Sequence, residues 1–259
     1  MLTWMLTGML AWIPVLVLVL LAWPVPAPAQ PMLQACSSDG HAVPPRLRER
    51  FISADCEACW RSAPPDDGHP ASDAVVLDWI TPGALADDAP LSAAALRDGL
   101  YRLQAIDATR PALPGAQADS GSLQRERAVQ RGDTRQPRPR LSIARGPALR
   151  GHVGVSIELE PAQGGPWDVW LALVEPLPAG SEGSPVARQL VRGSLQHRFA
   201  AHSAASGAEL DAASGATGWT ERRIMRVRDS ADSERLQLVG WVEDARGRMV
   251  TLTQTRCAP

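Results

Sequence analysis

Two cysteines separated by two residues, Cys56 and Cys59, are the side chains of this sequence whose types and spacing suggest a reaction. They follow directly after the short apolar run Phe51-Ile52-Ser53, which is typical of a strand. A Cys-x-x-Cys pair that begins a helix is a common form of a redox dithiol, because the helix amides and the helix dipole favour the thiolate. The spacing therefore supports a redox hypothesis for this pair.

Three interpretations of the pair remain open: a structural disulfide, a thiol–disulfide redox site and a metal site. Asp55 can cap the helix, but the negative charges of Asp55 and Glu57 disfavour a thiolate. Pro64 limits the helix to about two turns. A metal site needs two further ligands, and His197 and His202, which have a zinc-like spacing, lie far along the chain. The sequence therefore favours a structural disulfide, and we expect no metal and no cofactor.

The N-terminal segment indicates export. Residues 9–22 are an apolar run, and residues 27–29 (Ala-Pro-Ala) offer a cleavage site flanked by small residues. Pro14 interrupts the run, which is shorter than the roughly 20 residues of a membrane-spanning helix. We predict a signal peptide over residues 1–29 and a periplasmic or secreted protein without a stable membrane span after cleavage. An uncleaved anchor and a lipoprotein acylated at Cys36 remain alternatives.

Export also decides how the four cysteines are interpreted, because disulfides persist in oxidising compartments. Cys56 and Cys59 are close enough in sequence to pair with each other. Cys36 and Cys257 then remain, near the two ends of the mature chain, which commonly lie close together at a domain surface. We predict a Cys36–Cys257 disulfide, which contributes about 4–5 kcal/mol in the chain-entropy treatment of so long a loop.

Composition narrows the range of partners. The chain has 259 residues and a formal net charge of −2, and all 26 of its Lys and Arg residues are Arg. This balance argues against a nucleic-acid partner, and we expect instead an unidentified protein or envelope component. The Arg-rich stretch between residues 125 and 150 is interpreted as a solvated segment.

Apolar periodicity predicts the elements. Strands are expected at 48–53 and 74–80. A helix is expected at 92–106, with Leu96, Leu100, Leu103 and Ile106 on its apolar face. Residues 110–140 are rich in Arg, Gln, Gly, Ser and Pro and are expected to form a linker. Short alternating runs with Gly-rich and Pro-rich breaks then predict strands at 141–145, 152–159, 168–175, 187–195, 217–228, 236–243 and 250–255, with a hairpin turn at 244–247.

Three side chains in these strands call for an interpretation. Asp78 is an acid in the otherwise apolar strand AVVLDWI; a buried functional carboxylate is one interpretation, and a position facing water is favoured. Trp167 and Trp170 are explained by core packing. Trp60, directly after the cysteine pair, is expected to cover it as an apolar lid.

These segments resemble the secreted family described as domain of unknown function 1223. The resemblance rests on FISADCEAC, VVLDWI, DDAPLSAAALRDGL, WDVWLALVEP and QLVRGSL. It implies an exported thioredoxin-like domain with an appended β region, in which Cys56 attacks and Cys59 resolves. The family usually has a proline after its cysteines and a Thr-Pro-Gln strand, whereas this chain has Trp60 and no such strand.

The sequence as a whole predicts an α+β protein. A degenerate thioredoxin-like region at 30–109 is followed by the linker at 110–140 and by an antiparallel, sandwich-like β region at 141–259. The expected function is that of a non-catalytic binding or scaffold module with structural disulfides. The alternative is a periplasmic thiol–disulfide oxidoreductase that uses Cys56 and Cys59.

Overall fold

The structure is a computed structural model that describes residues 36–39, 42–63, 73–109, 121–130, 138–160, 165–199, 218–228 and 230–257. All of them belong to one compact unit, residues 33–259. The predicted signal peptide lies outside the described residues, as do Pro64 and His202. Among the described helices, none has both the length and the apolar character that crossing a membrane requires.

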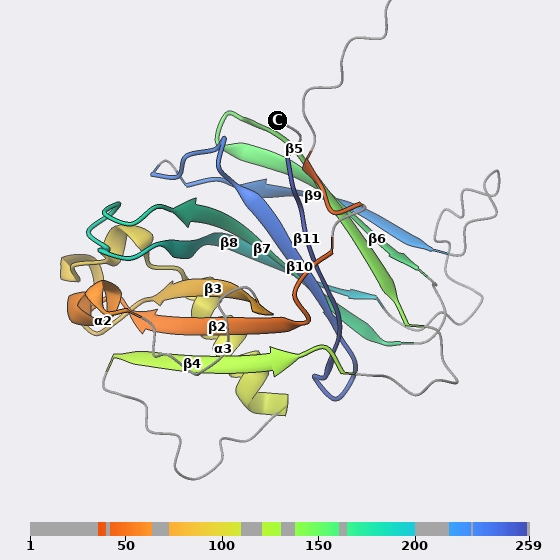
Figure 1. Ribbon diagram of the computed structural model, residues 1–259, viewed down its shortest axis with the longest axis horizontal. Coiled ribbons are helices and arrows are strands. Elements are labelled where there is room, and N and C mark those ends of the chain that lie inside the picture. The colour runs from red at the N-terminus through yellow and green to blue at the C-terminus, as the bar shows by residue number, and fades with distance from the viewer. Residues whose placement is uncertain are drawn as a thin grey trace, which may run out of the picture. The chain divides into compact units, whose positions relative to one another are not determined.

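The larger sheet has seven strands in the order β11-β10-β7-β8-β3-β2-β4 (Figure 1). The strands are β2 (Arg46–Ser53), β3 (Ala74–Thr81), β4 (Ser122–Ala128), β7 (Trp167–Leu177), β8 (Arg188–Phe199), β10 (Gln237–Glu243) and β11 (Met249–Gln254). β3 pairs in parallel with β2 on one side and with β8 on the other, and the remaining neighbours are antiparallel. Strands from both ends of the sequence therefore share one sheet.

The smaller sheet has four antiparallel strands in the order β1-β5-β6-β9. They are β1 (Cys36–Ser37), β5 (Arg140–Leu149), β6 (His152–Glu160) and β9 (Trp219–Arg226). Alternate residues of β6, such as Val155 and Ile157, are buried together with Val169, Leu171 and Leu173 of β7. The smaller sheet thus covers one face of the larger one, as in a β-sandwich.

The opposite face of the larger sheet is covered by a helix. Trp170, Ala172 and Val174 of β7 belong to a second buried cluster that contains Ile106 of α3 (Arg97–Thr109). β7 is therefore apolar on both of its faces, which explains why its sequence is an almost continuous apolar run. The other described helices are short: α2 (Glu57–Arg61) and the 3-10 turns η2 (Ala86–Asp88) and η3 (Ser92–Ala94).

The expected α+β fold, with a thioredoxin-like half followed by a separate β half, is wrong. Strands make up 52% of the described residues, and they lie in two sheets that draw on the whole described chain. β3 does not end a small sheet, because its outer edge pairs with β8 at Asp78 and Leu190. α2 has five residues, too few to cover a sheet face. The sandwich-like character predicted for the C-terminal strands is confirmed.

Most predicted strands are present within a few residues of their expected bounds, including the seven after residue 140. The hairpin turn is confirmed, since the Gly247 amide donates to the carbonyl of Asp244. The helix expected at 92–106 is divided: η3 ends at Ala94, Ala95 is extended, and α3 begins at Arg97. Leu100, on the expected apolar face, is 37% exposed. β4 was not predicted; it lies within residues 110–140 and pairs with β2.

Candidate functional site

The two predicted site residues are joined: Cys56 and Cys59 form a disulfide. β2 ends at Ser53, and a tight turn follows in which the Cys56 amide donates to the Ser53 carbonyl at 3.0 Å. Cys56 is the N-cap of α2, and its Sγ accepts a hydrogen bond from the Cys59 amide at 3.2 Å. Both cysteines are half-buried. The pair is therefore held at a strand end, with one backbone donor directed at the first sulfur.

The two acids beside the pair have partners of their own. Asp55 does not cap α2 as expected; its carboxylate accepts hydrogen bonds from the amides of Ala84 at 2.7 Å and Leu85 at 3.2 Å. Glu57 forms an ion pair with Arg61 at 2.8 Å. Because donors partly balance both carboxylates, their combined repulsion of a Cys56 thiolate is smaller than the sequence suggests.

Trp60 belongs to the buried cluster against which Cys59 packs, on the interior side of the pair. Its side chain is buried with Ile80 and Leu190, and its indole N–H donates to the Glu182 carbonyl at 2.8 Å. The Arg188 guanidinium lies 4.8 Å from the centre of the Trp60 ring and donates to the Trp60 carbonyl, at the end of α2. A cation at a helix C-terminus is favourable, although burial lowers the pKa of this guanidinium.

Gly121, directly before β4, lies against the disulfide. Its carbonyl accepts from the Ser53 amide at 2.9 Å. A Cβ atom at this position would lie 2.5 Å from Cys56 Sγ and 2.7 Å from Cys59 Sγ. Only glycine fits here while the disulfide and β4 keep these positions.

Gly121→Ala should therefore lower the free energy of unfolding of the oxidised protein by about 1–3 kcal/mol, the usual cost of overpacking. Gly154→Ala is the matched control, because a Cβ at Gly154 in β6 meets no atom within 4 Å; its effect should stay within about 0.5 kcal/mol. Urea unfolding of both variants measures the difference. Equal effects would show that the disulfide does not constrain Gly121.

The described residues offer no ligand set that would support the metal hypothesis. Within the described ranges, no group of three or more His, Cys, Asp or Glu side chains could hold an ion. His197 packs edge-on against Phe199 in β8, with ring centroids 4.4 Å apart. Its proposed partner His202 lies outside the described residues.

Asp78 does not face water, so the favoured interpretation of this residue is wrong. Its side chain is completely buried, forms an ion pair with Arg50 of β2 and accepts a hydrogen bond from the Gln189 amide at 2.9 Å. Burial raises the pKa of the Asp78 carboxyl, although Arg50 opposes the shift. Where β8 joins β3, the Asp78 carboxylate accepts a β8 backbone amide that would otherwise pair with a neighbouring strand. This is a structural role. Core packing is confirmed for Trp170, which is buried, and for Trp167, which packs against the sandwich cluster.

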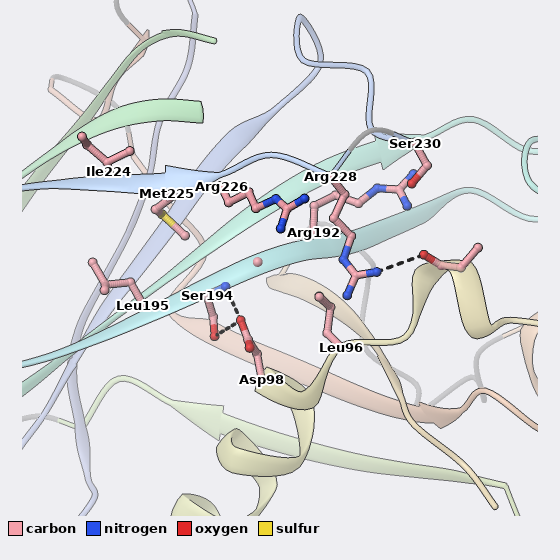
Figure 2. Close-up of a pocket in the computed structure, with 12 residues that line it drawn as sticks. Leu96, Asp98, Arg192, Ser194, Leu195, Ile224, Met225, Arg226, Arg228 and Ser230 are labelled. Atoms are coloured by element: carbon pink, nitrogen blue, oxygen red, sulfur yellow. Dashed lines mark hydrogen bonds between the residues drawn. The ribbon is translucent and has the colours of Figure 1, made fainter. Parts of the chain in front are cut away.

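An open groove of about 680 Å³ lies beside β8 and β9, and none of its lining residues belongs to the cysteine segment (Figure 2). Sequence reasoning missed this groove, because its residues come from three parts of the chain. They are Ala93, Leu96, Asp98, Arg192, Gly193, Ser194, Leu195, Ile224, Met225, Arg226, Arg228 and Ser230.

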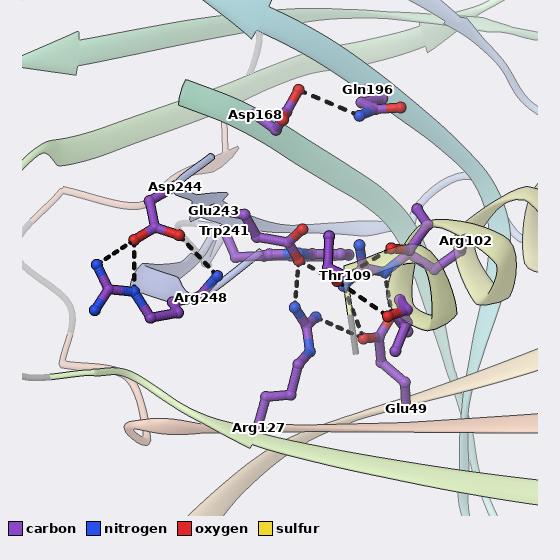
Figure 3. Close-up of polar contacts among 12 residues, drawn as sticks. Glu49, Arg102, Thr109, Arg127, Asp168, Gln196, Trp241, Glu243, Asp244 and Arg248 are labelled. Carbon is purple, nitrogen blue, oxygen red and sulfur yellow. Dashed lines mark hydrogen bonds and ion pairs between the residues drawn. The ribbon is translucent and has the colours of Figure 1, made fainter. Parts of the chain in front are cut away.

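Four buried charges form a network under α3 that sequence reasoning also missed (Figure 3). Arg102 of α3 donates to both carboxylate oxygens of Glu49, at 2.9 and 3.1 Å, and to Glu243 at 2.7 Å. Arg127 of β4 donates to the same two carboxylates. Burial alone would raise the pKa of each glutamate, but the two arginines outweigh it and hold both pKa values below the ordinary range.

Comparison with family models, with curated proteins and with solved structures found no match to this chain. The resemblance to the domain of unknown function therefore remains a prediction.

Proposed function

We propose that the Cys56–Cys59 pair performs thiol–disulfide exchange with cysteines of a partner protein. The observation that carries this proposal is the half-buried disulfide whose Cys56 Sγ accepts the Cys59 amide. A donor directed at one sulfur favours the thiolate at that position over its neighbour. Cys56 is therefore the nucleophile and leaving group, and Cys59 is the resolving thiol.

The exchange is balanced in two steps. A substrate thiolate attacks Cys56 Sγ, so that a mixed disulfide forms and the Cys59 thiolate is released. A second substrate thiolate then attacks the substrate sulfur of that mixed disulfide and releases the Cys56 thiolate. The substrate dithiol is oxidised to a disulfide by two electrons, and the protein pair is reduced. The reverse sequence, with Cys56 attacking, reduces a substrate disulfide.

The small ring argues against a mainly structural purpose for this disulfide. Its cysteines are 3 residues apart in sequence, whereas Cys36 and Cys257 are 221 residues apart. In the chain-entropy treatment, the short loop contributes about 2 kcal/mol and the long loop about 5 kcal/mol. The predicted Cys36–Cys257 disulfide is confirmed, and of the two it contributes more to the stability of the fold.

We also propose that the protein works in the periplasm or outside the cell. The support is the apolar N-terminal segment in the sequence together with two disulfides that use all four cysteines. Disulfides of this kind persist in oxidising compartments. The reaction partner there is a protein dithiol or disulfide.

The first experiment measures the reduction potential of the Cys56–Cys59 pair in the purified protein, by thiol trapping against glutathione buffers. We expect a value between about −120 and −270 mV, the range of exchange proteins. Cys59→Ser should accumulate a mixed disulfide with a disulfide-bonded test peptide, because Cys56 attacks the peptide disulfide and releases one peptide thiolate, whereas Cys56→Ser should not. Insulin reduction should be lost in Cys56→Ser, since no attacking thiol remains at the N-cap of α2.

The alternative function is a non-catalytic binding or scaffold module with structural disulfides, for which the long Cys36–Cys257 connection is the support. It predicts a pair that stays oxidised below about −300 mV. It also predicts equal reactivity of Cys56→Ser and Cys59→Ser towards the peptide. Either result would contradict the exchange proposal.

A further inference from the structure

The groove beside β8 begins where this strand leaves its parallel neighbour. β8 pairs with β3 at a single position, Asp78 with Leu190, and then continues to Phe199. The register against β7 shifts at the same place: Leu173 opposes Gly193, but Val174 opposes Val191. Arg192 is therefore the extra residue of a β-bulge, a feature that re-aims a side chain and is common beside binding sites.

Three guanidinium groups gather at the groove, and each is held differently (Figure 2). Arg192 is buried and donates to Glu175 at 2.6 Å and to Glu182. Arg228 donates to the carbonyls of Ala93 and Ala95, at 3.2 and 2.8 Å, which fixes it beside η3. Arg226 is exposed; its backbone pairs with His152 of β6, but its guanidinium makes no ion pair or hydrogen bond with the described residues.

The acid that lines the groove is already engaged. The Asp98 carboxylate accepts hydrogen bonds from both the amide and the hydroxyl of Ser194, at 2.8 and 3.1 Å. The Asp98 carboxylate thus accepts the β8 amide that no residue of β3 accepts at this position. It makes no ion pair with Arg226. Arg192 is neutralised by Glu175 and Glu182, which leaves Arg226 and Arg228 against the single acid Asp98. The groove as a whole therefore favours an anion.

Apolar side chains complete the lining. Leu96 and Met225 are buried at its base, and Leu195 is partly buried. Ile224, two residues before Arg226 on β9, is 75% exposed and so presents apolar surface to the groove. An alkyl chain beside these residues would remove apolar surface from water.

We propose that this groove binds an amphipathic anion, with a carboxylate or phosphate head at Arg226 and Arg228 and an apolar chain along Leu195 and Ile224. Arg226 supplies the charge-assisted hydrogen bonds, because its guanidinium does not have to give up an acceptor among the described residues in order to bind the anion. Arg228 contributes mainly its charge, because two of its N–H groups already donate to the carbonyls of Ala93 and Ala95. This site is independent of the cysteine pair.

The test titrates the full chain with decyl phosphate below its micelle concentration, followed by calorimetry. We expect one saturable site, at which Arg226→Gln weakens binding about 10- to 100-fold, as loss of a charge-assisted hydrogen bond does. Arg222→Gln is the matched control: it is exposed on the same strand, it carries the same charge, and it does not line the groove. It should change the affinity by less than about twofold.

Two comparison ligands identify the chemistry. Decanol should bind far more weakly than decyl phosphate, because it lacks the charge, and inorganic phosphate should bind far more weakly because it lacks the chain. Phosphate binding as tightly as decyl phosphate would overturn the apolar half of the proposal. An equal effect of Arg226→Gln and Arg222→Gln, or no saturable binding, would overturn the site.

Discussion

Arg102→Met should lower the free energy of unfolding at neutral pH by about 3–5 kcal/mol, the usual cost of breaking a buried ion pair. Arg102 is completely buried, and its guanidinium lies 4.5 Å and 4.9 Å from the ring centres of Trp170 and Trp241. Methionine retains most of the apolar stem but removes the charge. Glu49 and Glu243 then remain buried with Arg127 as their shared cation. Urea unfolding at pH 7 measures the loss.

The pH dependence of this loss separates charge from packing. In the wild-type protein the pKa values of Glu49 and Glu243 lie below the ordinary 4.5, so their contribution to stability is complete above pH 4.5 and disappears as the pH falls through the folded-state pKa values. Without Arg102, burial raises both pKa values. The difference between variant and wild type should therefore be small at low pH and grow as the pH rises past about 4.5.

Arg198→Met is the matched control for this change. Arg198 makes two hydrogen bonds to Asp168, at 2.7 and 2.8 Å, but its side chain is 66% exposed. Its removal should cost less than about 1 kcal/mol. If Arg102→Met loses the same stability at pH 3 as at pH 7, lost packing on the two tryptophans explains the effect and the charge network does not.

Removal of the Cys36–Cys257 disulfide should have the other large effect. The double variant Cys36→Ser and Cys257→Ser should lose about 5 kcal/mol, because its unfolded chain regains the freedom of a 221-residue loop. The disulfide also fixes β1 at the edge of the smaller sheet, where Cys36 pairs with Arg145. Urea unfolding under oxidising conditions, compared with wild type, gives the difference.

The second disulfide provides the comparison. Cys56→Ser with Cys59→Ser should lose only about 2 kcal/mol, since its loop is short. A loss as large as that of the long-range pair would mean that the Cys56–Cys59 disulfide holds Trp60 and Gly121 in place. It would then favour the scaffold function over exchange.

Local patterns predicted most of the fold because most strands bury alternate residues. β6 is the clearest example: Val153, Val155, Ile157 and Leu159 are all buried and alternate with residues that are less buried or exposed. The Cys36–Cys257 and Cys56–Cys59 pairs followed from cysteine number and compartment. The fold class was wrong because pairing between β3 and β8 depends on a single register position, which no local pattern encodes.

β4 and the charge network were missed for a related reason. β4 is an edge strand whose sequence, SLQRERA, is mostly polar, so it resembles a loop in composition. Arg127 within it is buried, against the expectation that this Arg-rich stretch is solvated, and Arg145 is buried as well. The cause for Arg127 is its ion pairs with two glutamates, Glu49 and Glu243, that lie far from β4 in the sequence. No pattern in the sequence around Arg127 indicates these two glutamates.

The pattern of the two disulfides also determines the order in which the cysteines can be oxidised correctly. A chain emerges from the ribosome with its N-terminus first. Cys36 is therefore exposed together with Cys56 and Cys59 long before Cys257, its native partner 221 residues away, has emerged. Oxidation in order of emergence would join Cys36 to one of the two neighbouring cysteines. Correct maturation therefore requires that Cys36 waits as a thiol, or that a non-native disulfide is exchanged later.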